Sequence, residues 1–145
     1  MPFDRPSLIP ELDVADLEQS LTFYLTVLGF RLHARRPEEK FVYLIREDVH
    51  LMLEEAAGPG RRFRTAPLEH PFGRGMNLQI AVSNIETLAS EVRQAGSTIV
   101  VPLEERWYRH GDNELGQRQF VVADPDGYLL RFFSDLGTRQ VRDTL

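Results

Sequence analysis

The feature that most constrains the fold is a phrase of strand, capped helix and glycine in residues 12–30, LDVADLEQSLTFYLTVLGF. Asp16 is a favourable N-cap, and Gln19 three residues later completes a capping box, so we expect a helix to begin at Leu17. Gly29 can adopt the left-handed conformation that ends such a helix. The apolar face of this helix is predicted at the spacing of Leu17, Leu21, Tyr24, Leu25 and Leu28.

A second copy of this phrase begins at Asn77 and reads NLQIAVSNIETLASEVRQAGSTIV. Aligning Val14 with Val82 places the cap Asp16 opposite Asn84. Strand, cap, helix and glycine occur together in many α/β proteins, so the pattern by itself leaves internal duplication and chance equally open. If the duplication is real, the chain contains two similar modules.

The remaining elements follow from β-prone runs and turn residues. In the first half we predict strands at 7–14, 31–35, 41–45 and 49–54, after an N-terminal arm. In the second half we predict strands at 77–82, 97–101, 119–123 and 128–133, with a helix at 85–95. The turn at 124–127, DPDG, joins the last two strands as a hairpin. After Pro102 come the stretch 105–109, ERWYR, and a loop with Gly111, Asp112, Asn113 and Gly116. Residues 134–145 are polar and charged and are expected to fray.

Residues 57–75 interrupt the pattern with prolines, glycines and arginines. We interpret this segment as a long connection between the halves. Its arginines Arg61, Arg62 and Arg64 are best explained as solvated side chains, and a clamp for phosphate or carboxylate is the alternative. Phe63 and Phe72 fit a lid as well as a plug, because loops of this length are often functional.

The composition excludes several classes of protein. The 145 residues suit one domain made of two modules, at about 8–56 and 76–134, joined by the loop 57–75. There are no cysteines, so thiolate chemistry and cysteine-ligated metals are excluded. A formal charge of −5 argues against nucleic acid as a partner. No apolar run approaches the roughly 20 residues that span a bilayer, and no signal peptide is recognisable, so we expect a cytoplasmic protein that does not bind membranes.

These motifs resemble those of the vicinal oxygen chelate superfamily, which includes glyoxalases, dioxygenases and bleomycin-resistance proteins. The resemblance lies in the first phrase, V-x-D-L-x-x-S-x-x-F-Y-x-x-x-L-G-F, in its echo after Asn77 and in the final DPDGYLLRF. It implies an α+β fold of two βαβββ modules, whose curved mixed sheets enclose a concave cavity that a second subunit often completes.

The resemblance also implies where a divalent metal ion would be bound in enzymes of this superfamily. The four ligand positions correspond here to Ile9, Glu54, Asn77 and Arg131. Only Glu54 is a suitable ligand, and an arginine adds a positive charge, so we predict no metal ion and no cofactor. A shift of register that brings in Glu11 would reopen the metal-dependent alternative.

Function is therefore expected on the strand faces that point away from the helices. If Leu51 and Leu53 pack on the helix, their neighbours on the same strand face the other way. Trp107 offers a ring for stacking on a planar ligand, with interface packing as the alternative. Glu54 is expected to meet a cationic group or to pair with Arg131. The predicted ligand-binding residues are Tyr43, His50, Met52, Glu54, Asn77, Gln79, Trp107, Gln119, Arg131 and Phe133.

The resemblance is strongest to the bleomycin-resistance proteins, which bind their drug without altering it. It favours a non-catalytic homodimer that sequesters a cationic, glycopeptide-type antibiotic in crevices at the dimer interface. The first alternative is a metal-dependent lyase, isomerase or dioxygenase of the same superfamily. The second is a sensor or subunit in an antibiotic-related pathway, for which the sequence carries no separate signal.

Overall fold

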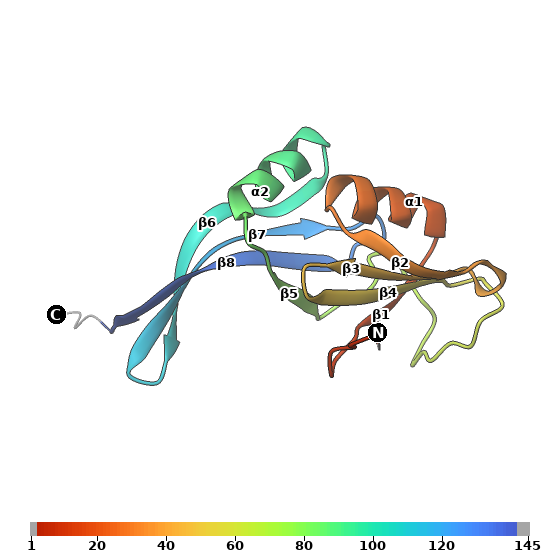
Figure 1. Cartoon of the computed structure of the whole chain (residues 1–145), viewed down its shortest axis with the longest axis horizontal. Coiled ribbons are helices and arrows are strands. Elements are labelled where there is room, and N and C mark those ends of the chain that lie inside the picture. The colour runs from red at the N-terminus through yellow and green to blue at the C-terminus, as the bar shows by residue number, and fades with distance from the viewer. Residues whose placement is uncertain (1–2, 142–145) are drawn as a thin grey trace. The chain divides into compact units, whose positions relative to one another are not determined.

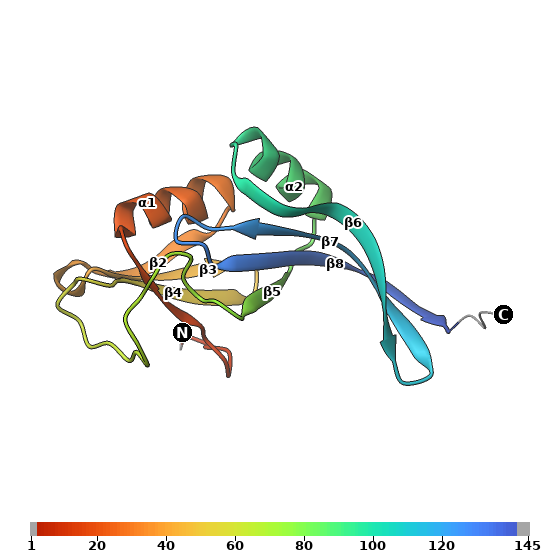
Figure 2. The same cartoon turned by 180° about the vertical axis from the view of Figure 1, so that it is seen from behind.

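The structure, a computed structural model, describes residues 3–141 and divides the chain into two compact units. The first unit contains the residues up to Phe72 together with Pro125–Gly127, and the second contains Gly73–Asp124 and the residues from Tyr128 onward. Each unit has one four-stranded mixed sheet and one helical segment that follows the first strand (Figures 1 and 2). Within residues 3–141, no helix is both long and apolar enough to cross a membrane.

The first unit has the strand order β1-β4-β3-β2, from β1 (Glu11–Val14), β2 (Arg31–Arg36), β3 (Phe41–Arg46) and β4 (Val49–Glu55). Strand β1 is parallel to β4, and the other pairs are antiparallel. Leu51 and Leu53 are fully buried with α1 on one face of the sheet. The predicted alternation along β4 is therefore confirmed, and His50, Met52 and Glu54 lie on the opposite face.

The helical segment of this unit differs from the single α-helix that the sequence predicts. Helix α1 (Leu17–Leu21) is capped by the Asp16 carboxylate, which accepts the Gln19 N–H at 3.2 Å, as expected. A π-helix then occupies Thr22–Val27, in which Leu28 N–H donates to Phe23 O. This wider turn rotates the following residues, so that Phe23 is buried and Leu25 is only half-buried. Gly29 ends the segment with a φ of 78°, as predicted.

The second unit repeats the plan with the order β5-β8-β7-β6. Its elements are β5 (Asn77–Ala81), α2 (Ile85–Gln94), β6 (Thr98–His110), β7 (Asn113–Ala123) and β8 (Leu129–Gln140). Asn84 caps α2 by accepting the Thr87 N–H, which matches the role of Asp16 in the first unit. The shared order, cap and parallel first strand confirm that the fold consists of two βαβββ modules.

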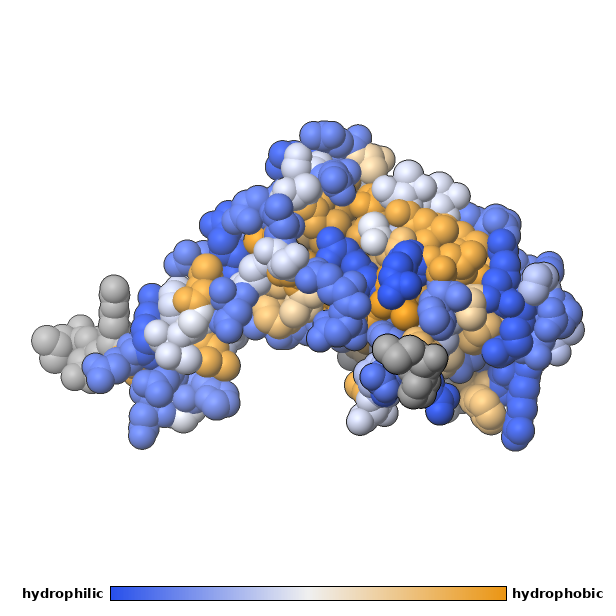
Figure 3. Space-filling view, viewed as in Figure 1, coloured by the Kyte–Doolittle hydropathy of each residue, from blue (hydrophilic) through white to orange (hydrophobic). Residues whose placement is uncertain are grey.

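The predicted loop around Gly111 is only the turn between β6 and β7, and the prediction of a frayed tail after 134 is wrong as far as Gln140. Strand β6 continues through Pro102 to His110, and β8 continues to Gln140, so that both pair with β7 beyond α2 (Figure 1). Strand β6 is an edge strand with irregular register around Pro102, which is where a proline is tolerated. The projecting end of this hairpin is covered mainly by hydrophilic residues, whereas apolar residues are visible around α1 (Figure 3). Residues 142–145 of the predicted tail lie outside the described residues.

Candidate functional site

Most of the predicted site residues fall into three groups, two in the first unit and one in the second, whereas Trp107, Asn77 and Phe133 lie outside them. In the first unit, the open face of β2, β3 and β4 carries an aromatic cluster of Phe3, His33, Tyr43 and His50. The Phe3 ring stacks on His33 at a centroid distance of 4.2 Å and lies nearly parallel to His50 at 5.5 Å. Tyr43 meets Phe3 edge-on, so two imidazoles and a phenol surround the ring of the N-terminal arm.

Tyr43 and His50 are also joined by a hydrogen bond of 2.7 Å between the phenol oxygen and Nδ1. Burial lowers the pKa of His50, and the nearby His33 and Arg31 lower it further. His50 is therefore held mainly in its neutral form, with which the phenol can share a hydrogen bond. Met52 packs beside this cluster against Tyr43 and its neighbours on β3. His50 and Met52 thus lie on one face of β4 as predicted, and Tyr43 of β3 lies beside them.

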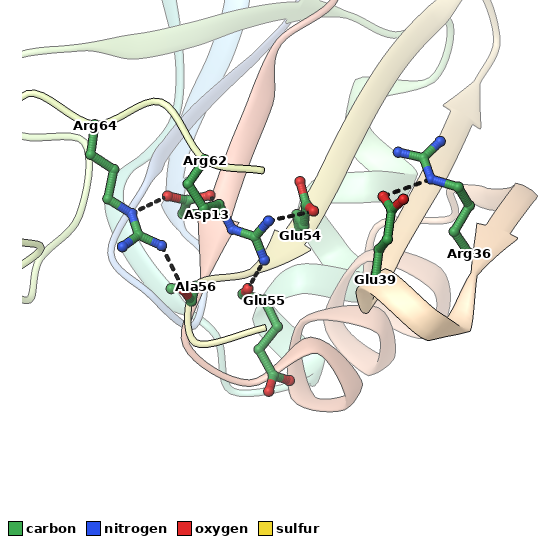
Figure 4. Close-up of polar contacts among 8 residues, drawn as sticks. All are labelled: Asp13, Arg36, Glu39, Glu54, Glu55, Ala56, Arg62 and Arg64. Carbon is green, nitrogen blue, oxygen red and sulfur yellow. Dashed lines mark hydrogen bonds and ion pairs between the residues drawn. The ribbon is translucent and has the colours of Figure 1, made fainter. Parts of the chain in front are cut away.

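The second group is charged and lies at the β1 edge of the same sheet. Asp13 on β1 is directly opposite Glu54 on β4. Arg62 forms ion pairs with both: its Nη1 contacts Glu54, and its Nε lies 3.4 Å from Asp13 Oδ1. Arg64 adds a 2.6 Å ion pair with the other oxygen of Asp13 (Figure 4). We call Glu11, Asp13 and Glu54 the carboxylate cluster.

The structure changes two expectations about this group. The arginines of the 57–75 loop are predicted to be solvated, and Arg61 and Arg64 are exposed, but the Arg62 side chain is only 11% exposed because it lies against the carboxylates. The expected partner of Glu54 was Arg131, whereas the structure pairs Glu54 with Arg62. A loop has no repeating pattern from which the partner of a side chain could be predicted. The one available signal was that the basic segment GPGRRFR closely follows the acidic end of a strand.

The third group is an amide network on the open face of the second sheet, centred on Gln119. Its amide nitrogen donates to Tyr108 at 2.6 Å and to Glu104 at 3.0 Å. Its amide oxygen accepts from Arg131 Nε and from Gln117. Gln79 extends the network from β5 by donating to Gln117. The members of the network are Gln79, Glu104, Tyr108, Gln117, Gln119 and Arg131, of which the sequence had missed Glu104, Tyr108 and Gln117.

Trp107 does not join this network, because it follows Arg106 and precedes Tyr108 on a strand whose side chains alternate between faces. Its ring lies against Gly116, with the Arg139 guanidinium 4.0 Å from the ring centroid. Its Nε1 donates to Glu105 at 3.0 Å. These contacts pack the ring against its own sheet, and its role in ligand binding stays a prediction.

Asn77 and Phe133 lie on β5 and β8, the strands that also carry Gln79 and Arg131 of the amide network. Asn77 begins β5 and pairs with Leu129, and Phe133 on β8 lies opposite Gln119 on β7. Asn77 is exposed and Phe133 half-buried, so both remain accessible on the second sheet. Their role in ligand binding stays a prediction.

The residues do not fit a divalent metal ion at the position that the resemblance implies. Glu54 is the only suitable ligand there, and Arg62 already neutralises its charge. Among residues 3–141, no three side chains of His, Asp or Glu are grouped so that they could hold a metal ion. The side chains present instead offer stacking, hydrogen bonds from neutral amides and negative charge.

Comparisons with known proteins agree with this fold. Residues 10–132 match the Glyoxalase/Bleomycin resistance protein/Dioxygenase superfamily, and the chain belongs to that family. A bleomycin resistance protein of Geobacillus stearothermophilus is 31% identical over 137 residues, which cover 88% of this chain and 96% of the relative. A protein of the same name from Staphylococcus aureus matches to the same extent.

Solved structures with similar folds include TioX from Micromonospora sp. ML1, with a TM-score of 0.71 and 23% identity over 89% of this chain and 98% of that one. A virulence protein from Salmonella typhimurium gives a TM-score of 0.67 at 25% identity, over 92% of this chain and 98% of its own. The likeness to TioX shows the fold alone.

Proposed function

We propose that this protein binds a cationic, glycopeptide-type antibiotic of the bleomycin class and sequesters it without chemical change. The observation that carries the proposal is the 31% identity to bleomycin resistance proteins over 96% of their length. The whole relative is matched, so the likeness includes both modules and is not confined to one motif.

The chemistry of the open strand faces supports the same function. The amide network around Gln119 offers neutral donors and acceptors, which can bind a polar ligand without acting as a general base. The aromatic cluster around Tyr43 offers ring faces for planar groups. The carboxylate cluster and the net charge of −5 favour a cationic ligand over an anionic one.

In the assembled form we propose a homodimer with its crevices between the two subunits, in accordance with the family resemblance. Light scattering on the purified protein measures this directly, and a monomer at micromolar concentration would contradict the dimer. The oligomeric state is expected to be independent of added antibiotic.

The decisive experiment is calorimetric titration with bleomycin, followed by mass spectrometry of the recovered drug. We expect saturable binding and an unchanged drug mass. Replacing the exposed Gln79 by alanine removes one donor of the amide network and should weaken binding roughly two- to tenfold, the value of about one hydrogen bond. Gln94→Ala on the outer side of α2 is the matched control and should bind like the wild type. An absence of saturable heat up to roughly 100 µM drug would overturn the proposal.

A further inference from the structure

Glu54 is buried by a loop and not by the sheet that carries it. The carboxylate lies on the open face of β4, where the sequence predicts contact with a ligand, yet its side chain is only 3% exposed. Residues 58–64 lie over it: the backbone at Gly60 and the guanidinium of Arg62 both contact the Glu54 carboxylate. We call residues 58–64 the strap.

All three nitrogens of the Arg62 guanidinium contact groups beneath the strap (Figure 4). Arg62 Nη1 is paired with Glu54, Nε with Asp13, and Nη2 donates to the backbone carbonyl of Glu55. Arg64 is a second anchor, with Nε on Asp13 and Nη2 donating to Ala56 O at 2.6 Å. One cation thus lies against two carboxylates and a carbonyl. Its Nη2 donates a hydrogen bond, whereas Nε and Nη1 contact the carboxylates as ion pairs without hydrogen-bond geometry.

The backbone of the strap lies close to Glu54 but is not part of the sheet. A Cβ added at Gly60 would overlap the Glu54 carboxylate, so a larger residue there would have to push that side chain aside. Residues 58–64 form no helix or strand. The strap is therefore held over Glu54 largely by its two arginines, and it can leave without breaking a ladder of the sheet.

The two guanidiniums of the strap are paired with two carboxylates, Asp13 and Glu54. The exposed Glu11 is a third carboxylate beside them. Burial raises the pKa of Glu11, and its hydrogen bond and charge interaction with Glu54 raise it further. Without Arg62 the remaining carboxylates would repel one another more strongly, so the cluster favours a cation in that place.

We propose that the strap is autoinhibitory, and that Arg62 occupies the place that a guanidinium or ammonium group of the ligand takes against Asp13 and Glu54. The inference rests on the proposed function for the cationic character of the ligand. A ligand must displace Arg62 before it binds, so its apparent affinity is reduced by the fraction of molecules in which the strap is open. For an open fraction of about 1–10%, removing the strap cation tightens binding roughly 10- to 100-fold.

The test uses ethylguanidinium as a probe, because it is a fragment of the arginine side chain. In Arg62→Ala, ethylguanidinium at millimolar concentration should raise the melting temperature saturably, with a dissociation constant at least roughly tenfold below that of the wild type. Arg61→Ala is the matched control, since the exposed Arg61 lies over Phe63 and contacts none of these carboxylates. Tetramethylammonium at equal concentration corrects for ionic strength.

The double variant Arg62→Ala, Glu54→Gln should lose the response to ethylguanidinium. An equal response in Arg62→Ala and Arg61→Ala would overturn the inference, as would a response that persists without the Glu54 charge. If no variant binds bleomycin but Arg62→Ala binds ethylguanidinium, the proposed function fails and the strap stands.

A second measurement needs no variant, in case Arg62→Ala does not fold. Phe63 is 79% exposed in the middle of the strap, and chymotrypsin cleaves after phenylalanine in mobile segments. Ethylguanidinium should speed cleavage after Phe63 in the wild-type protein several-fold, while tetramethylammonium leaves it unchanged. Cleavage that both salts accelerate equally would overturn the inference.

Discussion

At the scale of single residues, the carboxylate cluster shows how one extra charge is accommodated. Burial raises the pKa of Glu11, and the neighbouring carboxylates of Glu54 and Asp13 raise it further, because protonation of Glu11 relieves their repulsion. The native state binds this proton more tightly than the unfolded chain, in which the pKa of Glu11 has its ordinary value of 4.5. The free energy of unfolding therefore falls as pH rises from 4.5 through the native pKa.

The first prediction concerns Glu11→Gln, which keeps the hydrogen-bonding shape and removes the charge. We expect the variant to be more stable than the wild type at neutral pH. Its free energy of unfolding should also fall less steeply above pH 4.5 than that of the wild type. Urea unfolding at several pH values measures both effects. Burial raises the pKa of Asp126 as well, which adds a decline of the same sign to both proteins. A Glu11→Gln protein less stable than the wild type at pH 7 would show that the charge is favourable.

At the scale of elements, the β6–β7 hairpin carries the single tryptophan of the chain on the part of the sheet that extends beyond α2. Trp107 and Gly116 are directly paired, and the ring covers the place where a side chain at position 116 would stand. Arg139 from β8 lies over the ring and is paired with Glu114 at 3.0 Å. Three strands thus contribute to one side-chain stack, which explains why they remain paired so far beyond α2.

The second prediction is that Gly116→Ala dislodges this ring. An added Cβ would lie 2.6 Å from the indole, so the ring must lift, at a cost of about 1–3 kcal/mol of stability. Because Trp107 is the only tryptophan, its fluorescence should shift to longer wavelength. Leu115→Ala, whose side chain points to the other face, is the control and should leave the emission unchanged. An unshifted spectrum for Gly116→Ala would contradict the observed packing.

Helix ends could be predicted from the sequence, whereas the length of β6 and the type of the first helix could not. Caps and terminal glycines could be predicted because Asp16, Asn84 and Gly29 act through bonds to residues a few positions away. The length of β6 could not, because Pro102 usually marks an end and here lies in an edge strand with irregular register. The π-helix was missed for a related reason, since its wider turn leaves no distinct spacing in the sequence.

The candidate site divides in the same way between what was predictable and what was not. Alternation along β4 placed His50, Met52 and Glu54 correctly on one face. It could not identify Arg62 as the partner of Glu54, because a loop has no period that fixes the direction of a side chain. The same limit applied to Phe3, whose contact with His33 joins an arm to an edge strand 30 residues away along the chain.

At the scale of the whole molecule, the chain passes between the two units more than once. The turn Pro125–Gly127 lies between β7 and β8 in sequence but belongs to the first unit. There Asp126 Oδ1 accepts the Ala15 N–H at 3.1 Å, and its backbone oxygen accepts the Phe72 N–H at 2.8 Å. The first unit is therefore complete only when the second half of the chain supplies this turn.

The last prediction tests this dependence with Asp126→Ala. The Asp126 side chain is 4% exposed, and besides Ala15 it accepts a hydrogen bond from the Ser20 hydroxyl at 3.5 Å. Its loss leaves two donors at the start of α1 without their acceptor, which should cost about 1–3 kcal/mol. The loss should be visible as faster hydrogen exchange at the Ala15 amide. Asp135→Ala removes a comparable acceptor from the exposed Gly137 N–H in the second unit, and it should leave Ala15 protected. If Asp126→Ala leaves the exchange of Ala15 unchanged, the turn is not what holds the start of α1, and the first unit is stable without it.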